Sequence, residues 1–157
     1  MDAIDLKIIE ILQQNGRATQ SEIAPLVGLS QPAVADRIRK LEERGIIVGY
    51  AAIVDAAKLG KDITAFVSVG IEHPRFFEAF GEQMRSLPEI LECYRVAGPE
   101  SYLLKVKTDN TKSLDKLLVD TLRTIEGVTH TDTTIALSSI KETTALAIPT
   151  PQKAGKQ

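Results

Sequence analysis

The sequence predicts an α+β chain, a winged helix-turn-helix followed by a ferredoxin-like βαββαβ domain that forms an αβ sandwich. Three observations lead to this fold class. Apolar residues recur at helical spacing over the first third, strand and helix patterns follow in the order β-α-β-β-α-β, and a loop-like stretch separates the two regions. We therefore place domains at residues 1–54 and 63–142, a linker at 55–62 and a partly ordered tail at 143–157.

The first two helices have clear start and stop signals. An amphipathic helix is expected over about residues 2–14, where Asn15-Gly16 stops it. Thr19 and Glu22 then form a capping box, in which each side chain accepts a hydrogen bond from the backbone amide of the other residue. This box predicts the start of a short second helix.

The third helix carries the candidates for reading DNA. Ser30 is a suitable N-cap, Val34, Ile38 and Leu41 form the buried stripe, and Gly45 ends the helix. A helix of this kind, braced by a shorter one across a glycine-containing turn, enters the major groove in helix-turn-helix proteins. The face expected to point outward consists of Gln31, Ala33, Ala35, Asp36, Arg37, Arg39 and Lys40.

These outward side chains have different expected roles at DNA. Gln31 could read a base edge, Ala33 could touch a thymine methyl group, and Arg37 could reach guanine or a phosphate. The cations towards the end of the helix are better placed for phosphates, which position the protein without specifying sequence. The candidate DNA-binding residues are therefore Ser30, Gln31, Ala33, Arg37, Arg39, Lys40 and Arg44.

Residues 46–53 are expected to form two short strands about Gly49, a wing beside the three helices. The alternative is a three-helix bundle with a solvated charged face. Net charge does not favour DNA binding, because the chain carries −2 and its first 50 residues hold six Lys and Arg against seven Asp and Glu. DNA contacts must therefore come from a local patch. The wing and the Ser30 cap favour DNA binding over the plain bundle.

The second domain is expected to alternate four strands with two helices. The pattern predicts a strand at 63–71, a helix from Phe77 to Leu87, strands at 90–96 and 102–106, a helix capped by Thr111 and ended by Gly127, and a strand at 128–137. In this arrangement the helices cover only one face of the sheet. Phe66, Tyr94 and a row of threonines are available for the other face, which predicts a homodimer.

Four segments of the chain resemble the Lrp/AsnC family of transcriptional regulators, also called feast/famine regulators. They occur in the family's order over almost the whole chain up to about residue 142, and as a set they are specific. The segments are Ile4-Asp5-x-x-Ile8-Ile9-x-x-Leu12-Gln13-x-x-Gly16-Arg17, Leu29-Ser30 through Val34-x-x-Arg37-x-x-x-Leu41-Glu42-x-x-Gly45-Ile46-Ile47-x-Gly49-Tyr50, Glu92-Cys93-x-x-Val96-x-Gly98-x-x-x-Tyr102-Leu103-Leu104-Lys105, and Gly127-Val128-x-x-Thr131-x-Thr133-x-Ile135-x-Leu137.

The resemblance implies a homodimer that assembles further, often to an octamer of four dimers, and an amino acid or similar small effector bound between dimers. The family's effector loop frequently has the pattern Gly-Asp-aromatic-Asp. Here Pro99 and Ser101 stand where that pattern has its two acids, so other oxygens must hold the ammonium of an amino acid. The candidate effector-binding residues are Gly98, Pro99, Glu100, Ser101, Tyr102, Thr131 and Thr133. The alternative is a tight hairpin turn beside threonines that are present only for their strand propensity.

Other chemistry has little support in the sequence. The single Cys93 is expected to be a small core residue, and with two separated histidines it makes no metal-ligand spacing, so we expect no metal and no cofactor. Phosphate-loop and catalytic motifs are absent, which argues against an enzyme. The chain has no signal-peptide pattern and no apolar run long enough to span a membrane, so we expect a cytoplasmic protein.

Three functions remain open at this point. The first is a sequence-specific regulator that binds a roughly palindromic operator in double-stranded DNA and responds to an amino acid. The second is an architectural DNA-binding protein of the same fold that is insensitive to ligands. The third is a sensing module whose helical head docks to another protein. The resemblance favours the first, in which effector binding changes the assembly state and so the number of heads on DNA.

Overall fold

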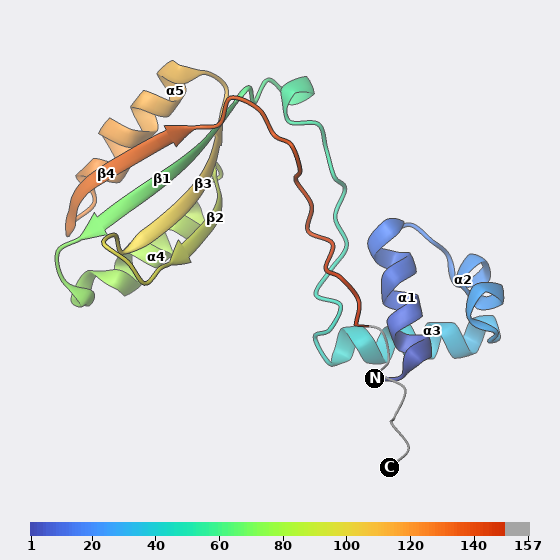
Figure 1. The fold of residues 1–157 in the computed structure, drawn as a ribbon. Helices are drawn as coiled ribbons and strands as arrows, with labels where there is room; N and C mark the ends of the chain where they lie inside the picture. Colours follow the sequence, from blue (N-terminus) through green and yellow to red (C-terminus); the bar gives the residue numbers. More distant parts are fainter. Residues whose placement is uncertain (150–157) are drawn as a thin grey trace, which may run out of the picture. The chain divides into compact units, whose positions relative to one another are not determined.

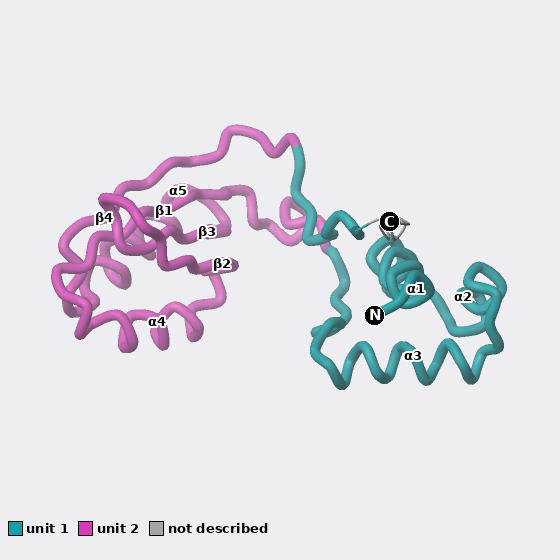
Figure 2. The backbone as a smooth tube through the Cα atoms, turned by 60° about the horizontal axis from the view of Figure 1, so that its bottom comes forward, with its two compact units in different colours: residues 1–53, 141–157 teal, residues 54–140 magenta. Residues whose placement is uncertain are grey.

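The computed structural model describes residues 1–149, and the chain divides into two compact units (Figure 2). The first unit, which we call the head, consists of residues 1–53 together with the chain from Lys141 onwards, and the second, the sensor unit, consists of residues 54–140. The predicted tail at 143–157 lies outside the described residues from 150 onwards. No helix in the described chain is both long and apolar enough to cross a membrane.

Three helices form the head: α1 (Ala3–Gln14), α2 (Gln20–Val27) and α3 (Gln31–Glu43). Their apolar faces meet in one small core, in which Ile8, Ile23 and Val34 have no exposed surface and Leu41 is 1% exposed. Each helix buries only one stripe, as its 3.6-residue period predicts. The helix-turn-helix arrangement is thereby confirmed.

Local capping sets the helix boundaries of the head. The Thr19 and Glu22 side chains form the predicted capping box at α2, and Ser30 caps α3. Asp2 and Asp5 form a further capping box at the start of α1. Gly45, directly after the α3 cap, has φ +67°, a left-handed conformation that glycine adopts without steric cost.

The predicted wing strands at residues 46–53 are wrong. Over this described stretch the chain bends at Ile46 and Ile47 and then forms no strand, and Val48 and Ile53 are 93% and 94% exposed. A strand requires a hydrogen-bonded neighbour, and no other segment among residues 1–149 pairs with the stretch. Side-chain pattern alone therefore overestimated the order here.

The sensor unit is built on one four-stranded antiparallel sheet with strand order β2-β3-β1-β4 (Figure 1). Its strands are β1 (Ile63–Ile71), β2 (Ile90–Arg95), β3 (Tyr102–Thr108) and β4 (Val128–Ile135). Helices α4 (Phe77–Ser86) and α5 (Thr111–Lys116) pack on one face, where Phe80, Leu104 and Leu122 have no exposed surface. This confirms the ferredoxin-like arrangement and the α+β class.

The helix after β3 differs from its prediction. Asn110, not Thr111, is its N-cap and forms a capping box with Ser113. The regular helix ends at Lys116, a π-helical turn follows over Leu117–Thr121, and a 3-10 turn over Leu122–Thr124 completes the element. These changes of pitch keep Leu114, Leu117 and Leu122 on the core, so the apolar stripe is retained although the helix is not uniform.

The sheet face opposite the helices is uncovered within the chain. Phe66 and Tyr94 lie on it and are 41% and 55% exposed. The predicted row of threonines on this face is only partly correct. Thr133 and Thr131 pair with the core residues Val67 and Val69, and directly opposite residues of antiparallel strands point to the same face. These two threonines therefore lie on the helix-covered side.

The chain after Lys141 returns to the head. The Gln13 side-chain amide donates a hydrogen bond to the Leu146 carbonyl at 3.0 Å, and its oxygen accepts one from the Leu146 amide at 2.7 Å. The described part of the predicted tail is thus tied to α1. Shorter 3-10 segments lie at Ala57–Leu59, within the predicted linker, and at Pro74–Phe76, before α4.

Candidate DNA-binding surface and effector site

The amino-terminal half of α3 presents small and polar side chains. The Ser30 Oγ accepts a hydrogen bond from the Ala33 amide at 3.4 Å, which leaves the hydroxyl hydrogen free to donate elsewhere. Gln31 is exposed, and Ala33 is half-buried beside the fully buried Val34. This half of the helix carries one side-chain amide, one hydroxyl and one methyl group, which are groups suited to contact the edge of a DNA base.

Arg37 faces the first helix rather than solvent. Its Nη1 lies 2.8 Å from Asp2 Oδ2 and 2.6 Å from Asp5 Oδ1, and its side chain is 29% exposed. Hydrogen bonds to Asp2 and then Asp5 raise the pKa of Arg37, while the Asp5 amide and the Arg37 guanidinium lower the pKa of Asp2. The expectation that Arg37 points outward is therefore wrong, because it ties α3 to the capping box of α1.

Arg39 and Lys40 are exposed but each has an acidic partner on the same helix. Arg39 lies 2.6 Å from Asp36 and 2.5 Å from Glu43, and Lys40 lies 2.6 Å from Asp36. Hydrogen bonds from Lys40 and then Arg39 lower the pKa of Asp36. Ion pairs this exposed contribute little stability, so a phosphate can replace the carboxylates without a large loss.

Arg44 and Arg17 differ from the other cations of the head. Both are exposed, and neither has an ion pair among residues 1–149. Arg44 caps the end of α3, and Arg17 lies in the turn between α1 and α2. Sequence reasoning included Arg44 but not Arg17, whose only signal was a cation placed directly before the Thr19 capping box.

The turn between β2 and β3 holds four of the predicted effector residues. Gly98 and Pro99 are exposed, while Glu100 and Ser101 are half-buried. The Ser101 amide donates to the Val69 carbonyl at 3.0 Å, and its Oγ accepts from the Ile71 amide at 3.1 Å. Ser101 therefore anchors the turn to the end of β1, although the sequence suggested it as a ligand contact.

Glu100 extends from this turn to His130 on β4. Glu100 Oε2 lies 2.8 Å from His130 Nε2, within ion-pair distance, but the atom accepts no directed hydrogen bond and has almost no exposed surface. Thr129 Oγ1 lies 3.0 Å from the other ring nitrogen of His130. His130 was not among the predicted site residues, since nothing local in the sequence links it to Glu100.

The remaining predicted residues lie elsewhere. Tyr102 is 6% exposed in the core, where its hydroxyl donates to the Phe77 carbonyl at 3.3 Å. Thr131 Oγ1 accepts from Arg123 Nε at 3.0 Å, and the Thr133 hydroxyl is buried without a hydrogen-bond partner. The turn and the two threonines thus project on opposite faces of the sheet, and one protomer does not gather all seven predicted residues around one point.

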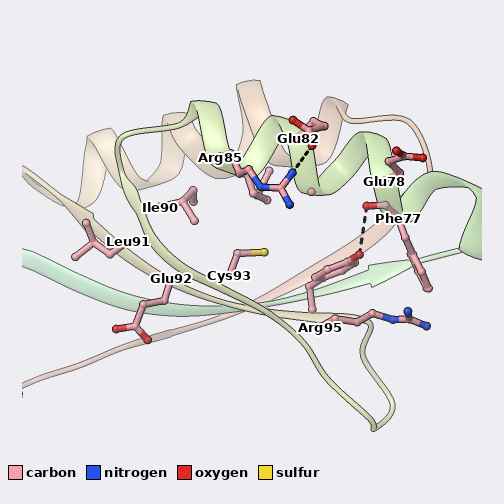
Figure 3. A pocket seen from close by; sticks show the side chains of 12 residues that line it. Phe77, Glu78, Glu82, Arg85, Ile90, Leu91, Glu92, Cys93 and Arg95 are labelled. Carbon is pink, nitrogen blue, oxygen red and sulfur yellow. Dashed lines mark hydrogen bonds and ion pairs between the residues drawn. The ribbon is translucent and has the colours of Figure 1, made fainter. Parts of the chain in front are cut away.

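A cavity of about 560 Å³ lies between α4 and the edge strand β2 (Figure 3). The Arg95 guanidinium stacks 4.4 Å from the centre of the Phe77 ring at one end, and Cys93 lines the cavity. Burial raises the pKa of the Cys93 thiol, but the residue is exposed on this side, so its assignment to the core is wrong. Of the predicted effector residues only Tyr102 lines this cavity.

Metal-binding geometry is not found in the described part of the chain, where no three His, Cys, Asp or Glu residues come close enough together to hold an ion. The polar side chains that do come together at one end of the sheet are those of Glu100 and His130. Their chemistry suits a small ligand with a positive charge and hydrogen-bonding groups.

Comparison with known proteins relates both units to regulators. Residues 1–48 match the model of a winged helix-turn-helix DNA-binding domain, and residues 64–146 match that of the Lrp/AsnC ligand-binding domain. The chain is 38% identical over 148 residues to the HTH-type transcriptional regulator FL11 of Pyrococcus horikoshii, covering 94% of this chain and 97% of that one. It is 37% identical over 144 residues to the leucine-responsive regulatory protein of Rhizobium meliloti, covering 90% and 92%.

Solved structures agree with these relatives. A transcriptional regulator of Neisseria meningitidis in complex with L-Met superposes with a TM-score of 0.89 at 32% identity, covering 94% of this chain and 96% of that one. Escherichia coli AsnC superposes with a TM-score of 0.86 at 28% identity, covering 92% and 97%. FL11 and the Neisseria protein are transcriptional regulators, and the Rhizobium relative is a leucine-responsive regulatory protein.

Proposed function

The chain belongs to the Lrp/AsnC family of DNA-binding transcriptional regulators, and from that premise we propose how its two units read DNA and sense an effector. We propose that the head binds double-stranded DNA and that the sensor unit binds an amino acid, or a similar small molecule, between dimers. The complex of the Neisseria regulator with L-Met supports an amino acid as the effector class.

At DNA, the amino-terminal half of α3 enters the major groove. Gln31 reads a base edge, the Ala33 methyl group contacts thymine, and the Ser30 hydroxyl donates to a phosphate. Arg39, Lys40, Arg44 and, in addition, Arg17 contact phosphates. Arg37 acts indirectly by holding α1 against α3, as its two carboxylate contacts at 2.6 and 2.8 Å support.

At the effector, the β2–β3 turn supplies the contacts. Glu100 accepts hydrogen bonds from the ligand's ammonium group, and backbone N–H groups of the turn beside Gly98 donate to its carboxylate, although Pro99 itself has no N–H to give. The observation that carries this proposal is the buried Glu100 oxygen without a directed donor, because such an atom is costly unless something pairs with it. Thr131 and Thr133 face the helices, so their hydroxyls are less suited to direct contact with the same ligand.

The assembly follows from the uncovered sheet face. We propose a homodimer in which the faces bearing Phe66 and Tyr94 meet, with further assembly to an octamer. Two heads on one dimer predict a roughly palindromic operator with half-sites about one helical turn apart, or a multiple of that. An effector with different affinities for two assemblies shifts their populations and so changes how many heads engage DNA. The protein works in the cytoplasm, where such DNA lies.

The architectural alternative, a ligand-insensitive DNA-binding protein, is less well supported. Residues 64–146 match a ligand-binding domain over most of the sensor unit. A purely architectural protein also gives no reason for a carboxylate oxygen held in a half-buried turn.

Thermal unfolding against each of the twenty amino acids at millimolar concentration tests the effector part of the proposal. A ligand at 100 times its dissociation constant stabilises a fold by about 2.7 kcal/mol, which gives a clear rise in Tm. Glu100→Gln should remove the rise, while Glu126→Gln, which changes an exposed carboxylate outside the turn, should keep it. A response of equal size in wild type and Glu100→Gln would contradict the assignment.

A gel-shift series with Gln31→Ala tests the DNA part, using a selected operator and a scrambled duplex. Loss of one base contact should weaken operator binding by about 1–3 kcal/mol and leave scrambled DNA unchanged. Gln14→Ala, an exposed glutamine on α1, is the matched control. An equal loss on both duplexes would show that Gln31 does not read sequence.

A further inference from the structure

Two buried side-chain oxygens among residues 1–149 have no hydrogen-bond partner, Glu100 Oε2 and Thr133 Oγ1. The carboxylate is the more consequential, since burying a charged oxygen without a donor is far more costly than burying a hydroxyl. Its nearest nitrogen partner is the Nε2 atom of the His130 imidazole, 2.8 Å away. The question is why the turn keeps a carboxylate in a place where the fold does not complete its hydrogen bonding.

His130 reaches Glu100 across β1 because the residue of β1 that lies between them, Gly70, has no side chain. His130 pairs with Gly70 on β1, and a Cβ on Gly70 would lie 2.3 Å from His130 Cε1 and 2.6 Å from Nδ1. Real Cβ atoms do not come this close, so the ring lies over the glycine. Glycine is therefore needed at position 70 for the close approach and not for an unusual backbone angle.

The β2–β3 turn is fixed by more hydrogen bonds than the His130 ring. Ser101 fixes the turn through two hydrogen bonds to β1, at 3.0 and 3.1 Å, and the Glu100 side chain is 25% exposed. The His130 side chain is 55% exposed, and its ring nitrogens lie beside Glu100 and the sequence neighbour Thr129. The Glu100 carboxylate is therefore held more firmly than the His130 ring, which can turn away from it when a ligand arrives.

We propose that His130 is an internal competitor for the effector, occupying the position on Glu100 that the ammonium group of an amino acid takes. This inference rests on the proposed effector site at the β2–β3 turn. The ammonium group supplies directed N–H donors that the imidazole in its present orientation does not, so the ligand completes the hydrogen bonding of the carboxylate. His130 therefore sets the affinity threshold, and ligands without an ammonium group do not displace it.

The same arrangement gives the site a preference for its chemical class. Glu100 is the only acid in the sequence from Gly98 to Tyr102. An α-amino acid presents a positive group to it, whereas the corresponding 2-hydroxy acid presents a neutral hydroxyl beside its own carboxylate. The hydroxy acid leaves the Glu100–His130 pair intact and should bind much more weakly.

The test is a thermal-shift titration of the full chain with each of the twenty amino acids, comparing wild type with His130→Ala. We expect the variant to bind the responding amino acids about two- to fivefold more tightly, the range that loss of one exposed competing side-chain contact supports. Glu126→Ala is the control, since Glu126 is exposed and lies outside both the β2–β3 turn and the sheet face that bears Phe66. The 2-hydroxy acid of the best ligand should give no shift in wild type.

Gly70→Ala is an independent second variant, because its Cβ pushes the His130 ring away from Glu100 without removing the ring. It should also tighten binding. If wild type responds to an amino acid and both variants bind it with unchanged affinity, the competitor role is overturned and the effector site stands. If no amino acid shifts wild type or His130→Ala, the competitor role and the proposed effector function are both overturned.

Discussion

On α3 each of the cations Arg37, Arg39 and Lys40 has a carboxylate within 2.8 Å, whereas on the β2–β3 turn the Glu100 carboxylate keeps one buried oxygen without a directed donor. These cations of the head thus have carboxylate partners within the head, whereas the sensor unit leaves the hydrogen bonding of one carboxylate incomplete. Exposed pairs exchange partners at little cost, while a buried oxygen that lacks a donor favours any ligand that supplies one.

The difference explains how a chain with net charge −2 can bind DNA. Five of the seven acids among residues 1–50 are partners of cations in the head, namely Asp2, Asp5, Glu10, Asp36 and Glu43, and so do not form a separate repulsive surface. Phosphates can replace these partners one by one on the exposed side of α3. At Arg37 the acids instead belong to the capping box of α1, where exchange would loosen the head itself.

The largest effect that separates the two units should come from their cores. Leu41→Ala in the head and Leu104→Ala in the sensor unit each remove a side chain that is at most 1% exposed, and each should cost about 2–5 kcal/mol. Because the head has the smaller core, Leu41→Ala should unfold the head and abolish DNA binding while the amino-acid response remains. Calorimetry with gel shift measures both, and loss of the amino-acid response in Leu41→Ala would contradict independent units.

The next effect concerns unpaired and paired cations. Arg44→Ala removes a cation that has no ion pair among the described residues, so the slope of log affinity against log salt should fall by about 1. Arg39→Ala should change the slope less, because Asp36 and Glu43 already compensate its charge. Equal changes in the two slopes would show that the intrahelical pairs do not persist in solution.

Acid should affect the head before the sensor unit. The carboxyl groups with clearly lowered pKa values are Asp2, Glu22 and Asp36, all in the head, and their ordinary values are 3.8, 4.5 and 3.8. A lowered folded-state pKa contributes stability above the unfolded-state value, and this is lost as pH falls through the folded-state value. Between pH 5 and about pH 3 the Tm of the head should therefore fall more than that of the sensor unit.

Calorimetry at stepped pH resolves the two transitions. Glu22→Gln should reduce the acid sensitivity of the head, because Glu22 owes its lowered pKa to the amide and then the hydroxyl of Thr19. Glu126→Gln in the sensor unit is the control. An equal fall in Tm of both transitions in wild type would contradict the greater acid sensitivity of the head.

The smallest expected effect is at the returning chain. Gln13→Ala removes both hydrogen bonds to Leu146 and should cost the head about 1 kcal/mol or less, since each bond is near the surface. Hydrogen exchange at the Leu146 amide should quicken, with Gln14→Ala as the control. Unchanged exchange in Gln13→Ala would mean that the two hydrogen bonds between Gln13 and Leu146 do not form in solution.

Local features of the sequence were enough to predict most element boundaries. The Thr19–Glu22 box, the Ser30 cap and the glycine after α3 act within a few residues, so the order of residues carries the information. The alternation in β1 likewise showed which side chains are buried. The wing failed because a strand depends on a neighbour that the pattern of residues 46–53 does not contain.

The candidate site divides along the same line. The sequence by itself determined the two-unit α+β architecture, the third helix with Ser30 as its cap and Gln31 and Ala33 in its first turns, and the turn at Gly98–Ser101. Only the tertiary structure decided that Arg37 belongs to α1, that Thr131 and Thr133 face the helices, and that Glu100 meets His130 across Gly70. The physical reason is distance along the chain, because contacts between residues about 30 positions apart depend on how helices and strands pack and not on any local pattern.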